Sequence, residues 1–130
     1  LYPTYPFRTP EDLSNIINSY KNIEEGTNLV GLLEPKVHPY LIYNRDEKGY
    51  MKQYSNFDAS KYYRRQDYPV VYELSHWACV VPNSDISDLN NQLIDKTTFG
   101  YLINKPIKIV DVDTLEDFSY AEFLATDQDP

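Results

Sequence analysis

Apolar residues recur at helical spacing directly after the opening segment, "LYPTYPFRTPEDL". In that segment Thr9 precedes a proline and two acidic residues, which is typical of a capping residue, a proline at the first helical position and acids in the first turn. The spacing gives one apolar face, made of Leu13, Ile16, Ile17 and Tyr20. We therefore predict a helix that begins after Thr9 and ends near Asn22.

Three apolar runs further along the chain have the character of strands: "TNLVGLLE", "PVVYELSHWACVVP" and "IKIVDVD". Residues 85–94 carry apolar side chains at helical spacing after a serine, so we expect a short helix capped by Ser84. Thr114 stands three residues before Asp117, an arrangement close to a capping box. It predicts a final helix with an apolar stripe of Leu115, Phe118, Ala121, Leu124 and Ala125.

Residues 35–67 lose this helical period and are rich in tyrosine, asparagine, aspartate and lysine. Within them "LIYNRDEKGYMKQY" predicts a hairpin whose turn lies between Asp46 and Gly49. We interpret residues 35–67 as an excursion from the main body. The remaining order of helices and strands predicts an α/β fold with a mostly parallel sheet covered by helices, without the glycine-rich phosphate loop that usually follows a first strand.

Length and charge narrow the function classes. The 130 residues are enough for one domain, and no apolar run approaches the roughly 20 residues of a membrane span. A net charge of −8 argues against electrostatic binding to nucleic acid or to an anionic membrane. A single cysteine, Cys79, excludes an intramolecular disulfide and fits a cytoplasmic location. Its apolar neighbours favour a buried residue over a reactive thiol.

The chain contains thirteen tyrosines, which suit a subunit interface, although a strand-rich surface accounts for them as well.

Asp111 and Asp113 are the residues with the clearest chemistry. They stand two positions apart near the end of the predicted strand "IKIVDVD", so their side chains would share one face. Two such carboxylates can hold Mg²⁺ and leave coordination sites for phosphate oxygens. The alternative is that they end the strand and help to cap the helix that follows.

Four segments, in order, resemble the CMP-sialic acid synthetase family, the acylneuraminate cytidylyltransferases. "LYPTYPFRTPEDL" is similar to that family's "QPTSPLRTxEDI", and "VHPY" to its "HPY". "RRQDYPVVYELSHWACVV" and "IKIVDVDTLEDFSYAEFL" resemble its "RQDLPxxYxxNGAIYI" and "IDIDTxEDFxxAE". The resemblance implies the later part of a cytidylyltransferase domain: a three-layer α/β/α fold without its N-terminal part, and with a dimerisation excursion at about residues 35–67.

The activity that the resemblance implies is transfer of a cytidylyl group from CTP to an acidic, sialic acid-like sugar, with release of pyrophosphate. Asp111 and Asp113 then become the catalytic Mg²⁺ ligands of a homodimeric enzyme. Arg65 and Gln66 match the family's "RQ" pair, and Arg65 would contact the acidic sugar, because a guanidinium suits a carboxylate. Thr4 and Arg8 match its "PTSPLR" segment as substrate-binding residues. A solvated arginine at Arg65, and a turn with a surface arginine at Thr4 and Arg8, are the alternatives.

The chain also departs from the family pattern. Tyr2 replaces a substrate-facing glutamine, and residues 75–77, "SHW", replace "NGA". His76 therefore becomes a further candidate substrate-binding residue, with a packed or hydrogen-bonded histidine as the alternative. We expect these 130 residues alone to be inactive, because the family's nucleotide loop is not among them. A non-catalytic sugar-nucleotide binding or assembly module on the same scaffold remains the alternative function.

Overall fold

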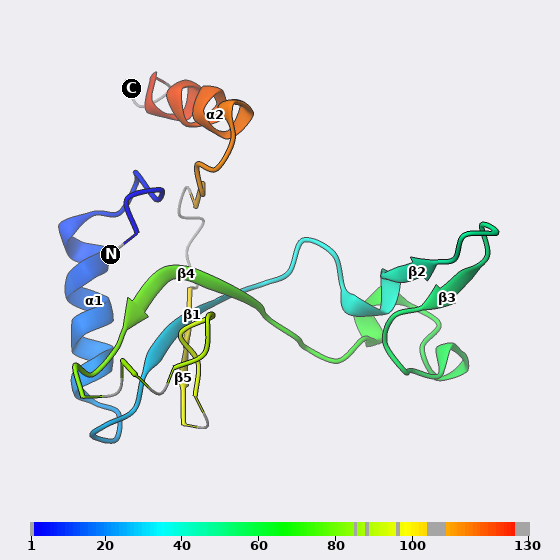
Figure 1. The fold of residues 1–130 in the computed structure, drawn as a ribbon, viewed down its shortest axis with the longest axis horizontal. Helices are drawn as coiled ribbons and strands as arrows, with labels where there is room; N and C mark the ends of the chain where they lie inside the picture. The colour runs from blue at the N-terminus through cyan, green and yellow to red at the C-terminus, as the bar shows by residue number, and fades with distance from the viewer. Residues whose placement is uncertain (1, 85, 88, 96, 104–108, 127–130) are drawn as a thin grey trace. The chain divides into compact units, whose positions relative to one another are not determined.

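The computed structural model describes residues 2–84, 86–87, 89–95, 97–103 and 109–126. The chain divides into two compact units. The larger unit comprises Leu1–Leu33 with Leu74–Pro130, and the smaller unit is Glu34–Glu73 (Figure 1).

Helix α1 of the larger unit, Pro10–Lys21, confirms the first predicted helix. Its N-terminus is a complete capping box: Thr9 Oγ1 accepts the Asp12 N–H at 3.2 Å, and Asp12 Oδ2 accepts the Thr9 N–H at 3.0 Å. The helix ends at a cap on Asn22, as its sequence predicts. The box satisfies donors that the first helical turn leaves without partners, which is why the helix begins at Pro10.

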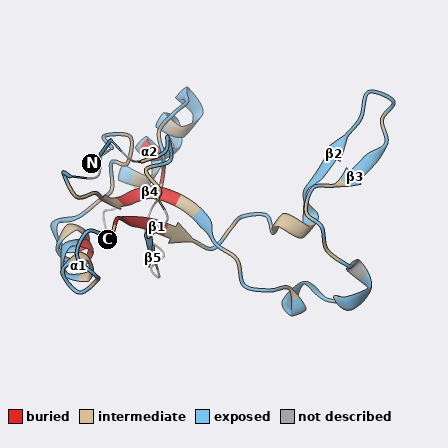
Figure 2. Cartoon of the chain, turned by 60° about the horizontal axis from the view of Figure 1, so that its bottom comes forward, coloured by how far each residue is buried: buried red, intermediate tan, exposed pale blue. Residues whose placement is uncertain are grey.

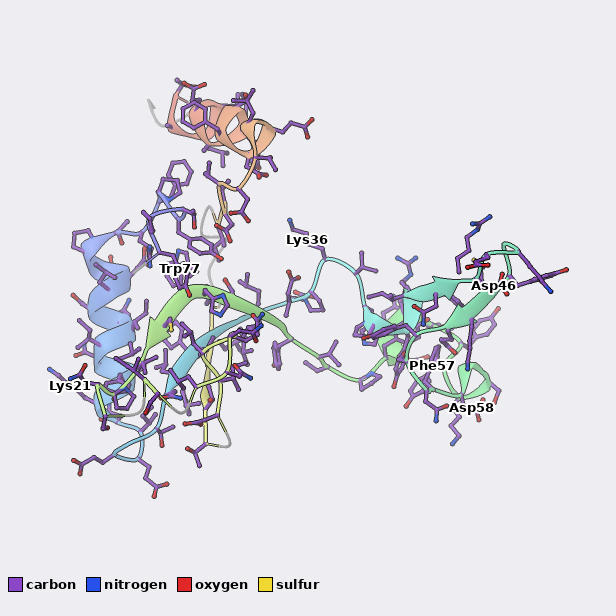
Figure 3. The ribbon with its side chains drawn as sticks, viewed as in Figure 1. Lys21, Lys36, Asp46, Phe57, Asp58 and Trp77 are labelled. Carbon is purple, nitrogen blue, oxygen red and sulfur yellow. The ribbon has the colours of Figure 1, made fainter. Side chains whose placement is uncertain are left out.

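Three strands form the sheet of the larger unit, in the order β4-β1-β5. They are β1 (Leu29–Leu33), β4 (Glu73–Val80) and β5 (Phe99–Leu102). Strands β1 and β5 run parallel with Leu29 opposite Phe99, and β4 makes the sheet mixed. Buried apolar residues of α1 and the sheet form one core, composed of Ile16, Leu29, Trp77, Ala78 and Ile103 (Figures 2 and 3).

The predicted three-layer α/β/α fold with a mostly parallel sheet is wrong. The described residues contain two α-helices, a mixed three-stranded sheet and a separate two-stranded sheet. Helix α1 supplies Ile16 to the core, whereas the second helix, α2 (Leu115–Thr126), contributes no residue to it. Burial of helices on both faces of a sheet defines the three-layer class, and that burial is not found here.

Two local predictions are also wrong. The described residues between 85 and 94 form turns instead of a helix, because the Asn90 side chain accepts the N–H groups of Gln92 and Ile94 at 2.9 and 3.0 Å. Residues 109–113 of the predicted strand "IKIVDVD" are not in a strand, and its residues 107–108 lie outside the described part. Strand β5, from an earlier segment, occupies the edge of β1 instead.

Helix α2 begins where the sequence predicts. Thr114 and Asp117 form its capping box, with Thr114 N–H to Asp117 Oδ2 at 2.8 Å and Asp117 N–H to Thr114 Oγ1 at 3.2 Å. Its predicted apolar stripe is mostly exposed: Ala121 is buried, but Leu115 is 81% and Phe118 50% exposed. The helix therefore forms from local signals without a buried stripe.

The smaller unit contains the predicted hairpin, with strands β2 (Tyr43–Arg45) and β3 (Met51–Gln53). Asp46 and Gly49 close its turn through a backbone hydrogen bond of 3.0 Å, and Gly49 adopts the positive φ of 94° that favours glycine. Close to the hairpin in sequence, five rings pack on one another in an aromatic cluster of His38, Tyr40, Phe57, Tyr62 and Tyr68. Tyr40 and Phe57 stack face to face, with ring centroids 3.8 Å apart.

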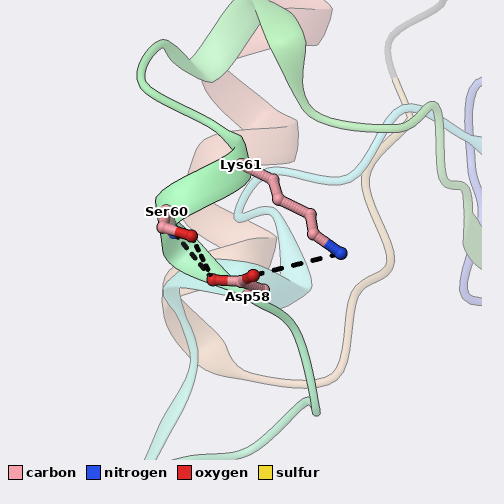
Figure 4. A network of polar contacts seen from close by, with 3 residues as sticks. All are labelled: Asp58, Ser60 and Lys61. Atoms are coloured by element: carbon pink, nitrogen blue, oxygen red, sulfur yellow. Dashed lines mark hydrogen bonds and ion pairs between the residues drawn. The ribbon is translucent and has the colours of Figure 1, made fainter.

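A polar turn lies beside this aromatic cluster in sequence. Asp58 Oδ1 accepts the N–H and the hydroxyl of Ser60, and its Oδ2 lies 3.9 Å from Lys61 Nζ (Figure 4). Both charged side chains are exposed, so this ion pair contributes little to stability. In the part of the chain that the structure describes, no helix is long and apolar enough to cross a membrane.

Candidate functional site

The segment that precedes α1 contacts two other parts of the larger unit. The Val112 N–H donates to the carbonyl oxygen of Thr4 at 2.9 Å. Arg8 Nη1 donates to the carbonyl oxygen of Trp77, on β4, at 3.2 Å. Residues 2–8, strand β4 and residues 109–113 thus meet, and these segments carry three of the four parts of the family resemblance.

Tyr5 is at the centre of this meeting point. Its side chain lies close enough to Asp111 and to Ser75 of β4 for both to affect its ionisation. Burial, then the interaction with the Asp111 carboxylate and its negative charge, raise the pKa of Tyr5 to about 12, against a smaller opposing effect of Ser75. The phenol therefore stays protonated at neutral pH. Ser75 is itself buried, and its Oγ also accepts the Trp77 N–H at 3.3 Å.

Arg8 fixes the same segment from the other side. Its guanidinium donates to the carbonyl oxygens of Tyr2 and Trp77, and its Cζ lies 5.6 Å from the centroid of the Tyr5 ring. These contacts use part of the donor capacity of the guanidinium. The geometry gives Arg8 a role in holding the segment, and Thr4 contributes its backbone carbonyl to the same purpose.

His76 points to the opposite face of β4 from Ser75 and Trp77, because successive side chains alternate along a strand. Its ring stacks on Tyr2 with centroids 5.4 Å apart and planes 28° apart. His76 Nε2 lies 2.9 Å from the carbonyl oxygen of Gln92, so the protonated nitrogen donates there. The ring is packed and hydrogen-bonded, and among the described residues no hydrogen bond to its Nδ1 is found.

Asp111 and Asp113 are both exposed in the extended stretch that leads to α2. Asp113 also donates its backbone N–H to Asp117 Oδ2 at 3.3 Å, so this stretch joins the capping box of α2. Among the described residues no group of three histidine, cysteine, aspartate or glutamate side chains is arranged to hold a metal ion. Mg²⁺ commonly uses one or two carboxylates together with water and phosphate oxygens, so two exposed carboxylates fit that ion.

Arg65 and Gln66 belong to the smaller unit, so the site built from the larger unit does not include them. They lie on the exposed 3₁₀ turn Arg65–Asp67. In the same unit, His38 Nδ1 accepts the Tyr40 N–H at 3.2 Å, and His38 Nε2 lies 3.0 Å from the carbonyl oxygen of Pro69. Both nitrogens of His38 therefore have backbone partners, as expected of a structural histidine.

Sequence reasoning missed Tyr5 as a site residue and treated Ser75 only as a departure from a family motif. Alternation of side chains along a strand carries a signal for Ser75, since it places Ser75 on the same face as the buried Trp77, with the less buried His76 between them. No pattern in the neighbouring sequence identifies Tyr5 as a site residue. Its role depends on contacts with Ser75 and Asp111, which are distant in sequence.

Comparison with known proteins adds no family assignment. No family model matches the chain, and no curated protein matches it in sequence. Functional interpretation therefore depends on the residues of the site and on the resemblance of their segments.

Proposed function

We propose that this chain is part of an enzyme that transfers a cytidylyl group from CTP to an acidic sugar and releases pyrophosphate. The observation that carries the proposal is the hydrogen bond from the Val112 N–H to the Thr4 carbonyl oxygen, at 2.9 Å, and the effect of Asp111 on the pKa of Tyr5 agrees with it. It brings the segment that resembles the family's substrate-binding motif against the segment that resembles its metal-binding motif. If the chain works as the CMP-sialic acid synthetase resemblance implies, the substrate-binding and metal-binding segments must lie close together. The mixed sheet is compatible with that arrangement.

Asp111 and Asp113 are the residues that would hold Mg²⁺ in this enzyme. The bound ion would neutralise charge on the phosphates of CTP during an in-line displacement. The anomeric oxygen of the sugar forms a bond to the α-phosphorus, the bond from that phosphorus to the bridging oxygen breaks, and pyrophosphate leaves with the electron pair. The hydroxyl proton passes to water.

Each unit, taken by itself, contains candidate substrate-binding residues. Arg65 and Gln66 are exposed, and the guanidinium of Arg65 is the group best suited to the carboxylate of an acidic sugar. His76 is the candidate in the larger unit, because its ring stacks on Tyr2 and no hydrogen bond to its Nδ1 is found among the described residues. Arg8 and Thr4 act by fixing the backbone of residues 2–8 next to Asp111.

We further propose a homodimer in which the smaller unit provides the contact. Its hairpin exposes Tyr50 and Tyr54, with 73% and 68% of their surfaces accessible. Large half-polar rings of this kind are enriched in subunit interfaces. A cytoplasmic location belongs to the same proposal, and the free Cys79 is compatible with a reducing compartment.

The test compares Asp111→Asn and Asp113→Asn with the wild-type protein at its natural length. Each substitution removes a charge from the Mg²⁺ ligands and nearly preserves shape, so pyrophosphate release from CTP and N-acetylneuraminate should fall by orders of magnitude. Glu122→Gln, an exposed carboxylate on α2, is the matched control and should leave the rate unchanged.

Melting curves measured in parallel separate the outcomes. Full activity in both aspartate variants contradicts the metal role. Loss of activity together with loss of the melting transition favours the structural alternative for these residues. Mg²⁺-dependent CTP binding by a wild-type protein that shows no turnover would favour the non-catalytic sugar-nucleotide module.

A further inference from the structure

We propose that the outer edge of β5 is an interaction surface at which two copies of this chain pair, with their β5 strands running antiparallel. The proposal goes beyond the proposed function, because it requires neither CTP nor a metal ion. It concerns the larger unit, whereas the dimer contact proposed above concerns the smaller unit.

Strand β5 lies at one edge of the sheet, since the strand order is β4-β1-β5. The N–H of Phe99, at its start, donates to the carbonyl oxygen of Asn28, directly before β1, at 2.7 Å. Successive backbone groups of a strand alternate between its two edges, so those of Phe99 and Tyr101 face β1. The N–H and carbonyl groups of Gly100 and Leu102 therefore point away from β1, and among the described residues no hydrogen bond to them is found.

Neither charge nor proline protects this outer edge. Natural edge strands are commonly shielded by charged side chains or by proline. Residues 97–103, "TTFGYLI", contain neither. The side chains of Phe99 and Leu102 are apolar, yet they leave 43% and 40% of their surfaces exposed. Such an edge is a template for pairing with another strand.

The charge of the chain favours β5 of a second copy as that strand. With a net charge of −8, two copies repel each other over most of their surfaces. Residues 97–103 carry no charge, so two β5 edges can approach without bringing like charges together. Antiparallel pairing of two identical edges also matches every donor with an acceptor, and it leaves neither edge open.

The directions of the backbone groups determine the register of this pairing. All four outward N–H groups of the two strands find acceptors only when Gly100 of one copy lies opposite Leu102 of the second copy. Tyr101 then lies opposite Tyr101 of the second copy, in a non-hydrogen-bonded pair whose Cα atoms are about 4.5 Å apart. The Tyr101 ring already packs against the core cluster, so the pairing extends the apolar surface of one sheet into the next.

A disulfide trap tests this register in the natural-length protein. The background is Cys79→Ala, so that no other cysteine of residues 1–130 takes part. Tyr101→Cys should give a covalent dimer under mild oxidation, because the two substituted positions lie at about 4.5 Å, within the reach of a disulfide. The edge is short, so we expect transient pairing that oxidation accumulates rather than a stable dimer.

Leu102→Cys is the matched control on the same strand. In the proposed register the two positions 102 are displaced by about 7 Å along the strands, in addition to the distance between the strands. That separation exceeds the reach of a disulfide, so this variant should stay uncrosslinked on a non-reducing gel. Equal or greater crosslinking of Leu102→Cys would overturn the inference, as would the absence of a crosslink in a folded Tyr101→Cys protein.

Replacing Tyr50 and Tyr54 by serine separates this contact from the dimer contact of the smaller unit. The Tyr101→Cys crosslink should still form in that double variant, because the hairpin takes no part in the pairing of β5. Loss of the crosslink there would show that the hairpin contact alone had brought the two positions together, and it would overturn the inference.

Hydrogen exchange in the unmodified protein decides the question if Tyr101→Cys does not fold. The amides of Gly100 and Leu102 should exchange more slowly as the protein concentration rises, because pairing supplies them with acceptors. The amide of Glu25, in an exposed turn of the larger unit, is the control and should exchange at one rate. Exchange at Gly100 and Leu102 that is independent of concentration would overturn the inference. If it is slow at every concentration, a strand of the same polypeptide covers the edge instead.

Discussion

The Val112 N–H donates to the carbonyl oxygen of Thr4 at 2.9 Å, and this bond connects the segment before α1 with the segment before α2. The bond replaces a strand pairing that the sequence led us to expect, because residues 109–113 are not part of the sheet. It is therefore important both for the candidate site and for attaching residues 109–113 to the larger unit.

Tyr5→Phe should reduce the dependence of stability on alkaline pH. Folding raises the pKa of Tyr5 from 10.0 to about 12, so this group stabilises the fold fully below pH 10 and loses its contribution as the pH rises to about 12. The fall in the free energy of unfolding between these pH values should be smaller in Tyr5→Phe than in the wild type. At neutral pH the variant should be less stable by about 1 kcal/mol.

Urea denaturation of both proteins at several pH values measures this difference. If the free energies of unfolding of Tyr5→Phe and of the wild type fall in parallel above pH 10, the pKa of Tyr5 is the same in the folded and unfolded states. That result would contradict the prediction.

Gly31→Ala should destabilise the larger unit by about 1–3 kcal/mol. A Cβ at this position of β1 would lie 2.6 Å from the carbonyl oxygen of Ser75 and 3.0 Å from Ile103 Cδ1. The first of these atoms belongs to backbone and cannot rotate away, so β4 has to shift.

Gly100→Ala is the matched control on the neighbouring strand β5. There the new Cβ would meet the Leu32 side chain, at Cδ1 and at Cγ, and this side chain, unlike a backbone carbonyl, can change rotamer. Thermal melting should show a clear decrease for Gly31→Ala and a much smaller change for Gly100→Ala. Equal decreases would show that the approach of Ser75 to Gly31 does not limit stability.

Asp95→Ala should lower the melting temperature and flatten its dependence on acid pH. The Asp95 carboxylate accepts the Thr97 N–H at 2.7 Å and Asn28 Nδ2 at 2.9 Å, and Asn28 is completely buried. The hydrogen bond from the Thr97 backbone, with further ones from Thr98, Thr97 and Asn28, lowers the pKa of Asp95 below its usual 3.8. Its stabilising effect is present above that value and is lost as the pH falls through the lowered pKa.

Melting curves at neutral and acid pH test this expectation, with Asp58→Ala as the control. Among the described residues, the Asp58 side chain bonds within its own exposed turn, to Ser60 and Lys61, so its removal should have a smaller effect at neutral pH. A larger effect of Asp58→Ala would contradict the importance of the buried Asn28 partner.

Replacing Tyr50 and Tyr54 together by serine should shift the proposed dimer towards monomer. Both residues are exposed and flank β3, and backbone hydrogen bonds of 3.0 Å join Tyr50 to Asp46 and Tyr54 to Ile42 across the hairpin. Light scattering over a range of concentrations measures the change. Tyr120→Ser, an exposed tyrosine on α2, should leave the mass unchanged. An unchanged dimer in the double variant, or a monomeric wild type, would contradict the proposed contact.

The sequence by itself determined the features that depend on neighbours along the chain. Thr9 with Asp12, and Thr114 with Asp117, begin the two helices through hydrogen bonds within four residues. The turn that ends at Gly49 closes the hairpin in the same local way. Such signals can be read from the sequence because both partners stand in one short segment.

Tertiary structure decided which strand lies next to β1 and which residues form the site. "IKIVDVD" has a stronger strand pattern than "FGYL", yet Phe99–Leu102 pairs with β1, and residues 109–113 bond to the segment before α1 instead. The apolar stripe of α2 predicts burial, but Leu115 and Phe118 remain exposed. Tyr5 meets Ser75 and Asp111 only after the chain has folded. A local pattern records what a residue prefers, whereas competition among distant segments for the same edge or partner is settled by packing.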